Sequence, residues 1–212
     1  ANSGTAGYIA GGTLGSPTYA AVTTIDKFAF SDDSRSTLGT GLTAATSETG
    51  AMANSGVAGY IGGGYSYSGS YTYYTTVDKW AFSDDSRTSL GTGILSVQRF
   101  APSGMANSGT AGYCLGGGNA VNARTADVTK FAFSDDSRTT LSTGLSEAGY
   151  YSAAMANSGV AGYNALAQGS DGDFTDVMDK FAFADDSRTT FAMVVQRNLI
   201  PSAFANCAAL SP

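Results

Sequence analysis

The sequence predicts an all-β protein that is built from one structural unit repeated four times. The tetrapeptide Ala-Asn-Ser-Gly begins at Ala1, Ala53, Ala106 and Ala156, and a decayed copy begins at Ala205. A second block, Asp-Lys-Phe-Ala-Phe-Ser-Asp-Asp-Ser-Arg with small changes, follows each of the four full copies. A repeat of about 50 residues that divides into four short strands is typical of β-propellers, in which each repeat forms one blade.

The second repeat shows how the strands of one unit are expected to follow one another. Three glycines at 62–64 stop the first strand, and Ser-Asp-Asp-Ser at 83–86 forms a tight turn because Asp and Ser side chains bond to nearby backbone amides. Asn-Ser-Gly at 107–109 makes a hairpin in which Gly supplies a positive φ. The pattern requires no helix, and the expected strands are Ala58 to Ile61, Thr75 to Phe82, Arg87 to Leu95 and Gly104 to Ala106.

The long strand of each repeat alternates in a way that predicts two covered faces. In the first repeat Phe28 and Phe30 point to one face, whereas Ile25 and Ala29 point to the other. A radial stack covers both faces when the ring of one blade lies over the alanine face of its neighbour. We therefore expect four phenylalanines to form the core between blades: Phe30, Phe82, Phe133 and Phe183.

Several motifs make the chain resemble the kelch family of β-propellers over nearly its whole length. A Tyr and an apolar residue precede a Gly pair, as in Tyr60-Ile61-Gly62-Gly63, and an aromatic residue such as Trp80 follows. Arg99 and Arg197 occupy the position of the family's downstream Arg. Two departures are that Phe replaces the family's Trp in three repeats and that the fourth repeat lacks the Gly pair. The repeats are also similar to kelch-like repeats in tail-associated and surface proteins of marine phages.

This resemblance implies one domain, a propeller of four kelch-like, four-stranded blades over residues 1–212. The approximate blade limits are 1–52, 53–105, 106–155 and 156–204, and the C-terminal segment 201–212 is expected to close the ring by supplying the innermost strand that blade one lacks. Two alternatives stay open. The chain could be a half ring that dimerises into eight blades, or a piece of a longer chain.

Composition excludes several classes of function. The chain has 11 Lys and Arg against 17 Asp and Glu and no basic cluster, so it would repel a phosphate backbone, and nucleic acid is not an expected partner. Its apolar runs are too short to span a bilayer. The absence of His removes the common catalytic triads and imidazole metal sites. Cys114 and Cys207 have neither metal-ligand spacing nor a scaffold-like count.

The loops divide between two faces of the expected disc. The Asn-Ser-Gly hairpins and the Asp-Asp turns share one face and hardly vary, whereas the loops on the other face vary in length and kind, as a recognition surface would. The segment at 65–74 is rich in Tyr, Ser and Gly, the composition of adaptable binding loops. The alternative is a hairpin whose tyrosines pack on one another. The candidate ligand-binding residues are Tyr65, Tyr67, Tyr71, Tyr73, Tyr74 and Arg99.

Acidic residues offer weaker candidates. Asp171, Asp173 and Asp176 resemble a Ca²⁺ loop but lack its terminal Glu, so a solvated turn is favoured and no metal or cofactor is predicted. The only glutamates, Glu48 and Glu147, lie in corresponding loops of blades one and three, and a glycosidase-like carboxylate pair is conceivable.

The sequence as a whole favours a non-catalytic binding or structural module. We expect it to recognise a protein or glycan receptor as part of a virion or cell surface, which would place it outside the cell. The second hypothesis is a purely structural assembly or decoration domain that packs against other chains. A glycosidase-like propeller enzyme is the third.

Overall fold

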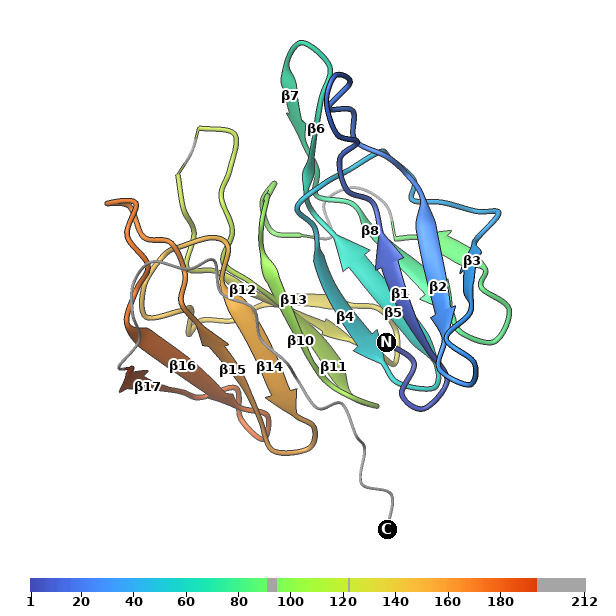
Figure 1. Ribbon diagram of the computed structural model, residues 1–212. Helices are drawn as coiled ribbons and strands as arrows, with labels where there is room; N and C mark the ends of the chain where they lie inside the picture. The colour runs from blue at the N-terminus through green and yellow to red at the C-terminus, as the bar shows by residue number, and fades with distance from the viewer. Residues whose placement is uncertain (91–94, 122, 194–212) are drawn as a thin grey trace.

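The computed structural model describes residues 1–90, 95–121 and 123–193, and this part of the chain consists of antiparallel β-sheets joined by turns and loops, without a helix (Figure 1). It therefore contains no helix long and apolar enough to cross a membrane. The all-β prediction is confirmed. The expected closing strand at 201–212 lies outside the described residues, as do Arg197 and Cys207.

Four sheets follow one another along the chain, and each takes three of its strands from one sequence repeat. The inner strands of the last three sheets, at 50–54, 103–107 and 153–157, cross the expected blade limits, so the strand expected at Gly104 to Ala106 belongs to the third sheet and not to the second. The first sheet has three strands in the order β1-β2-β3, and the other three have four strands each, in the orders β4-β5-β8-β9, β10-β11-β12-β13 and β14-β15-β16-β17. Their bounds are β1 Ala6–Ala10, β2 Ile25–Ala29, β3 Arg35–Thr37, β4 Gly50–Asn54, β5 Ala58–Gly62, β8 Val77–Ala81, β9 Arg87–Ser89, β10 Ser103–Asn107, β11 Ala111–Leu115, β12 Val128–Ala132, β13 Arg138–Thr140, β14 Ala153–Asn157, β15 Ala161–Ala165, β16 Val177–Ala182 and β17 Arg188–Ala192. A separate hairpin is formed by β6 Tyr65–Tyr67 and β7 Tyr71–Tyr73.

Two strand assignments differ from the expectation. Strand β9 ends at Ser89, whereas the sequence suggested a strand up to Leu95. The variable loop at 65–74 contains two strands of its own. The first sheet has no strand equivalent to β4, so β1 forms its inner edge among the described residues.

Small residues allow the inner strands β4, β10 and β14 to lie side by side. Gly104 of β10 lies so close to the backbone of Ala51 in β4 that a Cβ atom would collide with it. Gly112 and Gly162 likewise lie under the side chains of Met52 and Met105 from the preceding sheets. The close approach of neighbouring sheets thus requires glycine at positions 104, 112 and 162.

The two kinds of invariant turn have the chemistry that their sequences predict. Gly56 and Gly109 of the Asn-Ser-Gly hairpins have φ of 78° and 81°. In the Asp-Asp turns the first Asp accepts a hydrogen bond from the backbone amide two residues on, as Asp84 does from Ser86 at 3.0 Å. The second Asp, for example Asp85, has a positive φ of 55°. The hairpin between β14 and β15 and the turn between β2 and β3 lie at the lower edge of Figure 1, opposite the β6–β7 hairpin.

The core lies between successive sheets. Phe131 of the third sheet packs against Met52, Val77 and Leu95 of the second sheet and its outgoing loop, and Phe181 and Phe183 of the fourth sheet pack against the third. Trp80 of the second sheet packs against Ile25 and Leu42. Each sheet thus lays its aromatic face on its predecessor, as the alternation predicts, with one correction. Phe30 is 50% exposed, because no described sheet precedes the first one.

One set of polar and ring contacts recurs at all three junctions between sheets. A tyrosine of each sheet stacks on the phenylalanine of the next sheet, at centroid distances of 5.2, 5.1 and 5.3 Å, and its hydroxyl donates to the second Asp of that sheet's turn. A lysine donates to the other oxygen of the same Asp. An asparagine accepts from a glycine amide of the next hairpin. The members, in chain order of the junctions, are Tyr8, Lys27 and Asn2 with Phe82, Asp85 and Gly56; Tyr60, Lys79 and Asn54 with Phe133, Asp136 and Gly109; and Tyr113, Lys130 and Asn107 with Phe183, Asp186 and Gly159.

These contacts, which we call the junction contacts, correct one expectation about the Asp-Asp turns. In the sequence each Asp pair is followed by a Ser and an Arg, and this pattern predicts that these two residues cap and neutralise the pair. Instead the second Asp is neutralised by a lysine of the preceding sheet, as Asp85 is by Lys27 at 2.6 Å. Arg87, the arginine that follows Asp84 and Asp85, instead donates to the carbonyl of Gly41 at 2.6 Å.

Candidate binding site on the variable-loop face

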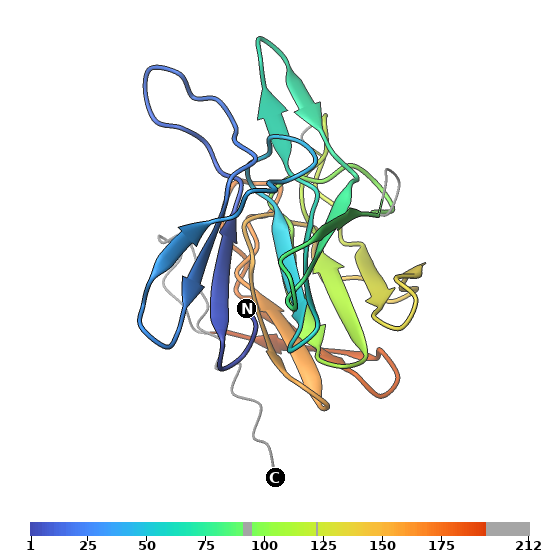
Figure 2. The same ribbon diagram turned by 90° about the vertical axis from the view of Figure 1, so that its right-hand side faces the viewer.

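The β6–β7 hairpin presents four tyrosines on one of its sides. Tyr65 pairs with Tyr73 and Tyr67 pairs with Tyr71 in the ladder, so that all four side chains share one face. Their rings lie 4.9 to 6.1 Å apart between centroids. Tyr67 and Tyr71 remain 49% and 59% exposed. The hairpin is at the top of Figures 1 and 2, away from the four sheets.

Tyr74, the fifth candidate, lies on the other side of the hairpin. Its hydroxyl is 2.9 Å from the hydroxyl of Ser66, which alternates with Tyr65 and Tyr67 along β6. The alternative in which the tyrosines of the hairpin pack on one another is therefore correct, and part of their ring surface is also exposed. The four rings contact one another, and two of them still face solvent.

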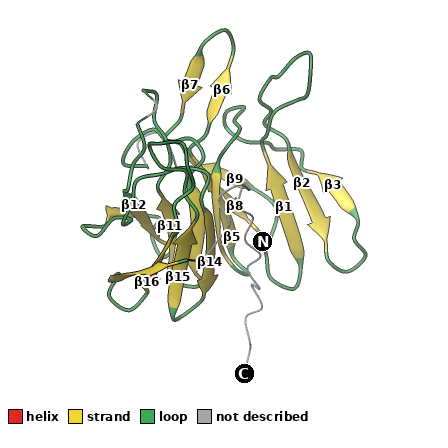
Figure 3. Cartoon of the chain, turned by 60° about the vertical axis from the view of Figure 1, so that its left-hand side comes forward, coloured by secondary structure: helices red, strands yellow, loops and turns green. Residues whose placement is uncertain are grey.

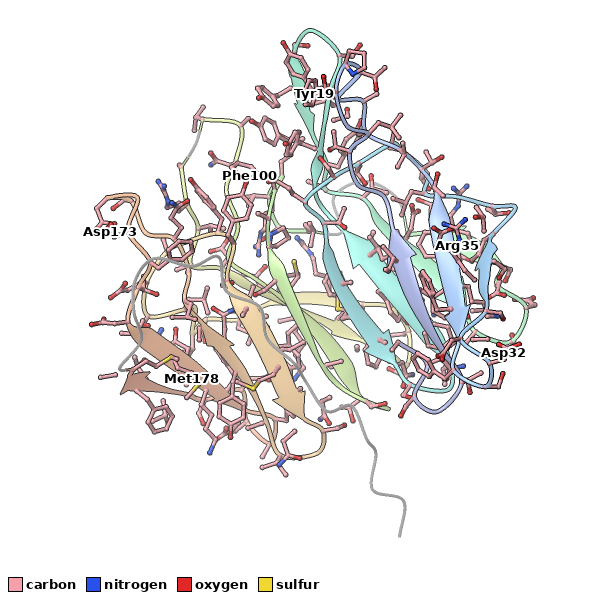
Figure 4. All side chains as sticks on the ribbon, viewed as in Figure 1. Tyr19, Asp32, Arg35, Phe100, Asp173 and Met178 are labelled. Carbon is pink, nitrogen blue, oxygen red and sulfur yellow. The ribbon has the colours of Figure 1, made fainter. Side chains whose placement is uncertain are left out.

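The row of rings continues from the hairpin over the loops of the next sheets. The ring of Phe100 lies 5.6 Å from Tyr73 and 5.3 Å from Tyr150, and Tyr150 meets Tyr151 edge-on at 4.8 Å. The guanidinium of Arg124 lies 4.5 Å from the centre of the Tyr150 ring. Figure 4 shows Phe100 between the hairpin and the loops of the third and fourth sheets. We call these seven residues the aromatic ladder: Tyr65, Tyr67, Tyr71, Tyr73, Phe100, Tyr150 and Tyr151.

Glu48 holds two members of the aromatic ladder together. Its Oε1 accepts hydrogen bonds from the hydroxyls of Tyr151 at 2.9 Å and Tyr65 at 3.3 Å. Its Oε2 is buried and has no partner among the described residues. Burial raises the pKa of both phenols, and the neighbouring carboxylate raises it further, so both tyrosines remain protonated donors at neutral pH.

Equivalent positions of three loops bring Glu48 and Tyr151 together. Glu48, Ala101 and Tyr151 all have φ near +50° and lie in the loops that follow the outermost strands β3, β9 and β13 of successive sheets. Ala101 donates its amide to the carbonyl of Glu48, and Tyr151 donates to the carbonyl of Ala101. The sequence did not single out Phe100, Tyr150 or Tyr151 as site residues. Two aromatic residues side by side at 150–151 in a variable loop were the available signal.

Arg99 is not part of this surface, which corrects its assignment as a ligand-binding residue. Its side chain is completely buried and donates to the carbonyls of Gly116 at 3.3 Å and Asp127 at 3.2 Å, and to the hydroxyls of Ser96 and Thr129. It fixes the end of β11 and the start of β12 relative to its own loop. The neighbouring Phe100 is the residue of this loop that reaches the aromatic ladder.

The three Ca²⁺ candidates border an open groove of about 520 Å³. Asp171, Asp173 and Asp176 line it together with Glu147, Arg124 and Phe174. Asp171 accepts a hydrogen bond from the backbone amide of Asp173, as in a turn. Over the described residues, no three acidic or cysteine side chains converge in a way that could hold a metal ion.

The two glutamates occupy different surroundings. The residue of the third sheet that is equivalent to Glu48 is Tyr151, which has the same positive φ. Glu147 lies four residues earlier and lines the groove beside Arg124. Glu48 instead bonds Tyr65 and Tyr151. The sequence placed the pair in corresponding loops, but the structure does not place them at corresponding positions.

Comparisons with known proteins show the fold and little more. No protein-family model and no curated protein sequence matches the chain. Among solved structures, the structure of YjhT is similar to it with a TM-score of 0.69 at 12% sequence identity. The match covers 88% of this chain and 66% of YjhT, so the chain spans just under two thirds of that protein's length. At this identity the likeness concerns the fold alone.

Proposed function

We propose that the four sheets are kelch-like blades of a β-propeller and that the protein is a non-catalytic binding module. The proposal assigns it to a virion or cell surface, where it would recognise a glycan or a protein receptor. The repeats, the strand order within each sheet and the fold shared with YjhT support the propeller assignment.

The observation that carries the binding role is the aromatic ladder. It gathers seven rings from the hairpin and from two further loops, while the invariant turns of the same repeats lie on the opposite side. Phenol rings stack on the apolar faces of sugars, and their hydroxyls supply hydrogen bonds with little loss of conformational entropy. Arg124 adds a guanidinium at the end formed by Tyr150 and Tyr151, and Glu48, which accepts from Tyr65 and Tyr151, holds the rings of that end in place. A row of rings with a guanidinium at one end suits an extended carbohydrate.

A glycan array tests this role directly. The wild-type chain should bind at least one class of glycan, and Tyr67→Ala combined with Tyr71→Ala should weaken that binding by more than about tenfold. Because both side chains are about half exposed, the melting temperature should hardly change. Tyr19→Ala is the matched control, since Tyr19 is an exposed tyrosine of another loop.

Two results would contradict the proposal. Unchanged glycan binding in the double variant would remove the aromatic ladder as the site. Absence of binding to any glycan or cell surface by the wild-type chain would favour the second hypothesis, a structural assembly or decoration domain. The junction contacts make that second hypothesis specific, because they show how one sheet of this type packs on another.

A further inference from the structure

The two end faces of the row of sheets carry opposite halves of the junction contacts. At each of the three junctions the earlier sheet supplies Tyr, Lys, Asn and, at two of them, Met, and the later sheet supplies Phe, Asp and Gly. Three junctions use three copies of each half. The fourth copy of each half is left over at an end of the row.

The fourth sheet keeps the Tyr-Lys-Asn half without a partner in the described part of the chain. Tyr163, Lys180 and Asn157 align with the residues that bond the next sheet elsewhere. Their backbones pair within the fourth sheet, but no hydrogen bond, ion pair or ring contact joins their side chains to a described residue. Asn157 is exposed, whereas its three counterparts are buried. Met155 is 39% exposed, whereas Met52 and Met105 are buried over glycines of the following sheets.

The first sheet keeps the Phe-Asp-Gly half. The ring of Phe30 is half exposed, and Asp33 is exposed, whereas Phe133 and Phe183 are only 8% exposed. Asp33 has a φ of 55°, like its counterparts at Asp85, Asp136 and Asp186. Its turn therefore already has the backbone shape that receives a tyrosine hydroxyl and a lysine amine elsewhere in the molecule.

We infer that the fourth sheet of one molecule binds the first sheet of a second copy of this chain, head to tail, through a fourth set of junction contacts. Lys180 and Tyr163 would bond Asp33, Tyr163 would stack on Phe30, and Asn157 would accept from the amide of Gly4. The two faces are complementary to each other and not to themselves, so the contact is heterologous. Lysine on one face and aspartate on the other also oppose any pairing of like faces.

A second copy fits better than the same molecule's own other end. The first and fourth sheets lie at opposite ends of the row in Figure 1, and Figure 3 shows β1 to β3 and β14 to β16 apart in a second view. No hydrogen bond or ring contact among the described residues joins the two sheets. This inference concerns the ends of the row, so it does not depend on the glycan-binding role of the aromatic ladder.

Charge reversal provides the decisive experiment, with sedimentation velocity over a wide concentration range as the readout. The wild-type chain should associate reversibly as its concentration rises. Asp33→Lys and Lys180→Asp should each weaken that self-association by at least about tenfold, because like charges then meet at the contact. An equimolar mixture of the two variants should associate again, since each contact between unlike molecules pairs a lysine with an aspartate. Asp135→Lys, which changes the charge of an exposed turn away from both end faces, should associate like the wild type.

Folding of the variants is checked separately. Neither the Asp33 nor the Lys180 side chain has a hydrogen-bond partner among the described residues, so both single variants should keep the circular dichroism spectrum of the wild type in dilute solution. Lys180→Asp should also keep its melting temperature, whereas Asp33→Lys places a lysine at a φ of 55° and should lower it by a few degrees. A wild-type chain that stays monomeric at every concentration would overturn the inference. So would single variants that associate like the wild type, or a mixture that does not associate. If each single reversal destabilised the monomer, and a chain carrying both reversals regained the stability of the wild type, the fourth sheet would instead be bound to the first sheet of the same molecule.

Discussion

The hydroxyl of Tyr60 in the second sheet donates a hydrogen bond of 2.8 Å to Asp136 in the turn of the third sheet. Lys79, which pairs with Tyr60 across β5 and β8, donates to the other oxygen of the same carboxylate at 2.7 Å. The two donors come from one sheet and their acceptor from the next. This relationship explains why Tyr, Lys and the second Asp recur in every repeat, because each junction needs all three.

Replacing Asp136 with Asn tests the energetic value of this contact. The amide keeps the shape of the side chain and tolerates the positive φ, but it loses the charge and places a donor near Tyr60 or Lys79. We expect the free energy of unfolding to fall by about 1 to 3 kcal/mol, measured by urea denaturation. Asp135→Asn is the control, because the exposed Asp135 accepts from the backbone amide and the side chain of Ser137, and an amide oxygen can still accept both hydrogen bonds. Equal effects of the two substitutions would mean that the junction bond adds no stability.

Phe133 and Phe30 occupy equivalent positions, but replacing each with alanine should lower the free energy of unfolding by different amounts. Phe133 is buried under Tyr60, so Phe133→Ala should lower the free energy of unfolding by about 3 to 5 kcal/mol. Phe30 is half exposed, and Phe30→Ala should cost less than about 1 kcal/mol in dilute solution. Denaturation of the two variants side by side provides the measurement. A large cost at Phe30 in the monomer would show that another part of the same chain covers it.

The sequence predicted the fold well because each repeat carries the same local signals four times. Period-two alternation, positive-φ glycines and Asp turns are local properties, and they indicated the strands, the hairpins and the two loop faces. The repeat could not show that an aspartate of one unit is bonded by a lysine of the unit before it. That pairing depends on how successive sheets stack, which no spacing within a repeat reveals.

The candidate site was predicted less completely. The tyrosines of 65–74 were found from composition, but Phe100, Tyr150 and Tyr151 belong to loops that approach the hairpin only after folding. Arg99 was misplaced for the same reason. A charged side chain in a variable loop is usually exposed, and only the surrounding carbonyl groups, distant in sequence, allow it to be buried.

Alkaline pH should weaken the junctions between sheets. Burial, followed by the bond to the aspartate, raises the pKa of Tyr8 and Tyr60 above the ordinary 10.0. The hydrogen bond to Asp85 raises the pKa of Lys27 above 10.5. A raised pKa means that the folded state holds its proton more tightly than the unfolded chain does. The stability from these groups is therefore complete below about pH 10 and is lost as the pH rises through the folded pKa values.

The measurement is a series of urea denaturations across this alkaline range. The free energy of unfolding should decline with pH, and Tyr60→Phe should decline less steeply, because one titrating phenol is removed. Tyr19→Phe, at an exposed position outside the junctions, should keep the slope of the wild type. Identical slopes in all three proteins would show that Tyr60 contributes nothing to the pH dependence.

Substitutions of Arg99 should change the stability of the protein but not its binding of glycans on the variable-loop face. Its guanidinium bonds carbonyl oxygens on two strands of the third sheet, and Arg99→Met would leave those buried acceptors without donors. We expect a loss of at least about 2 kcal/mol in the free energy of unfolding. Arg99→Lys keeps the charge but has a single nitrogen, so it should recover only part of that loss. In both variants, measured where they remain folded, glycan binding should stay within about twofold of the wild type, because the completely buried Arg99 presents no atom to a ligand. A variant that keeps its stability but loses glycan binding would return Arg99 to the binding site and would contradict its burial.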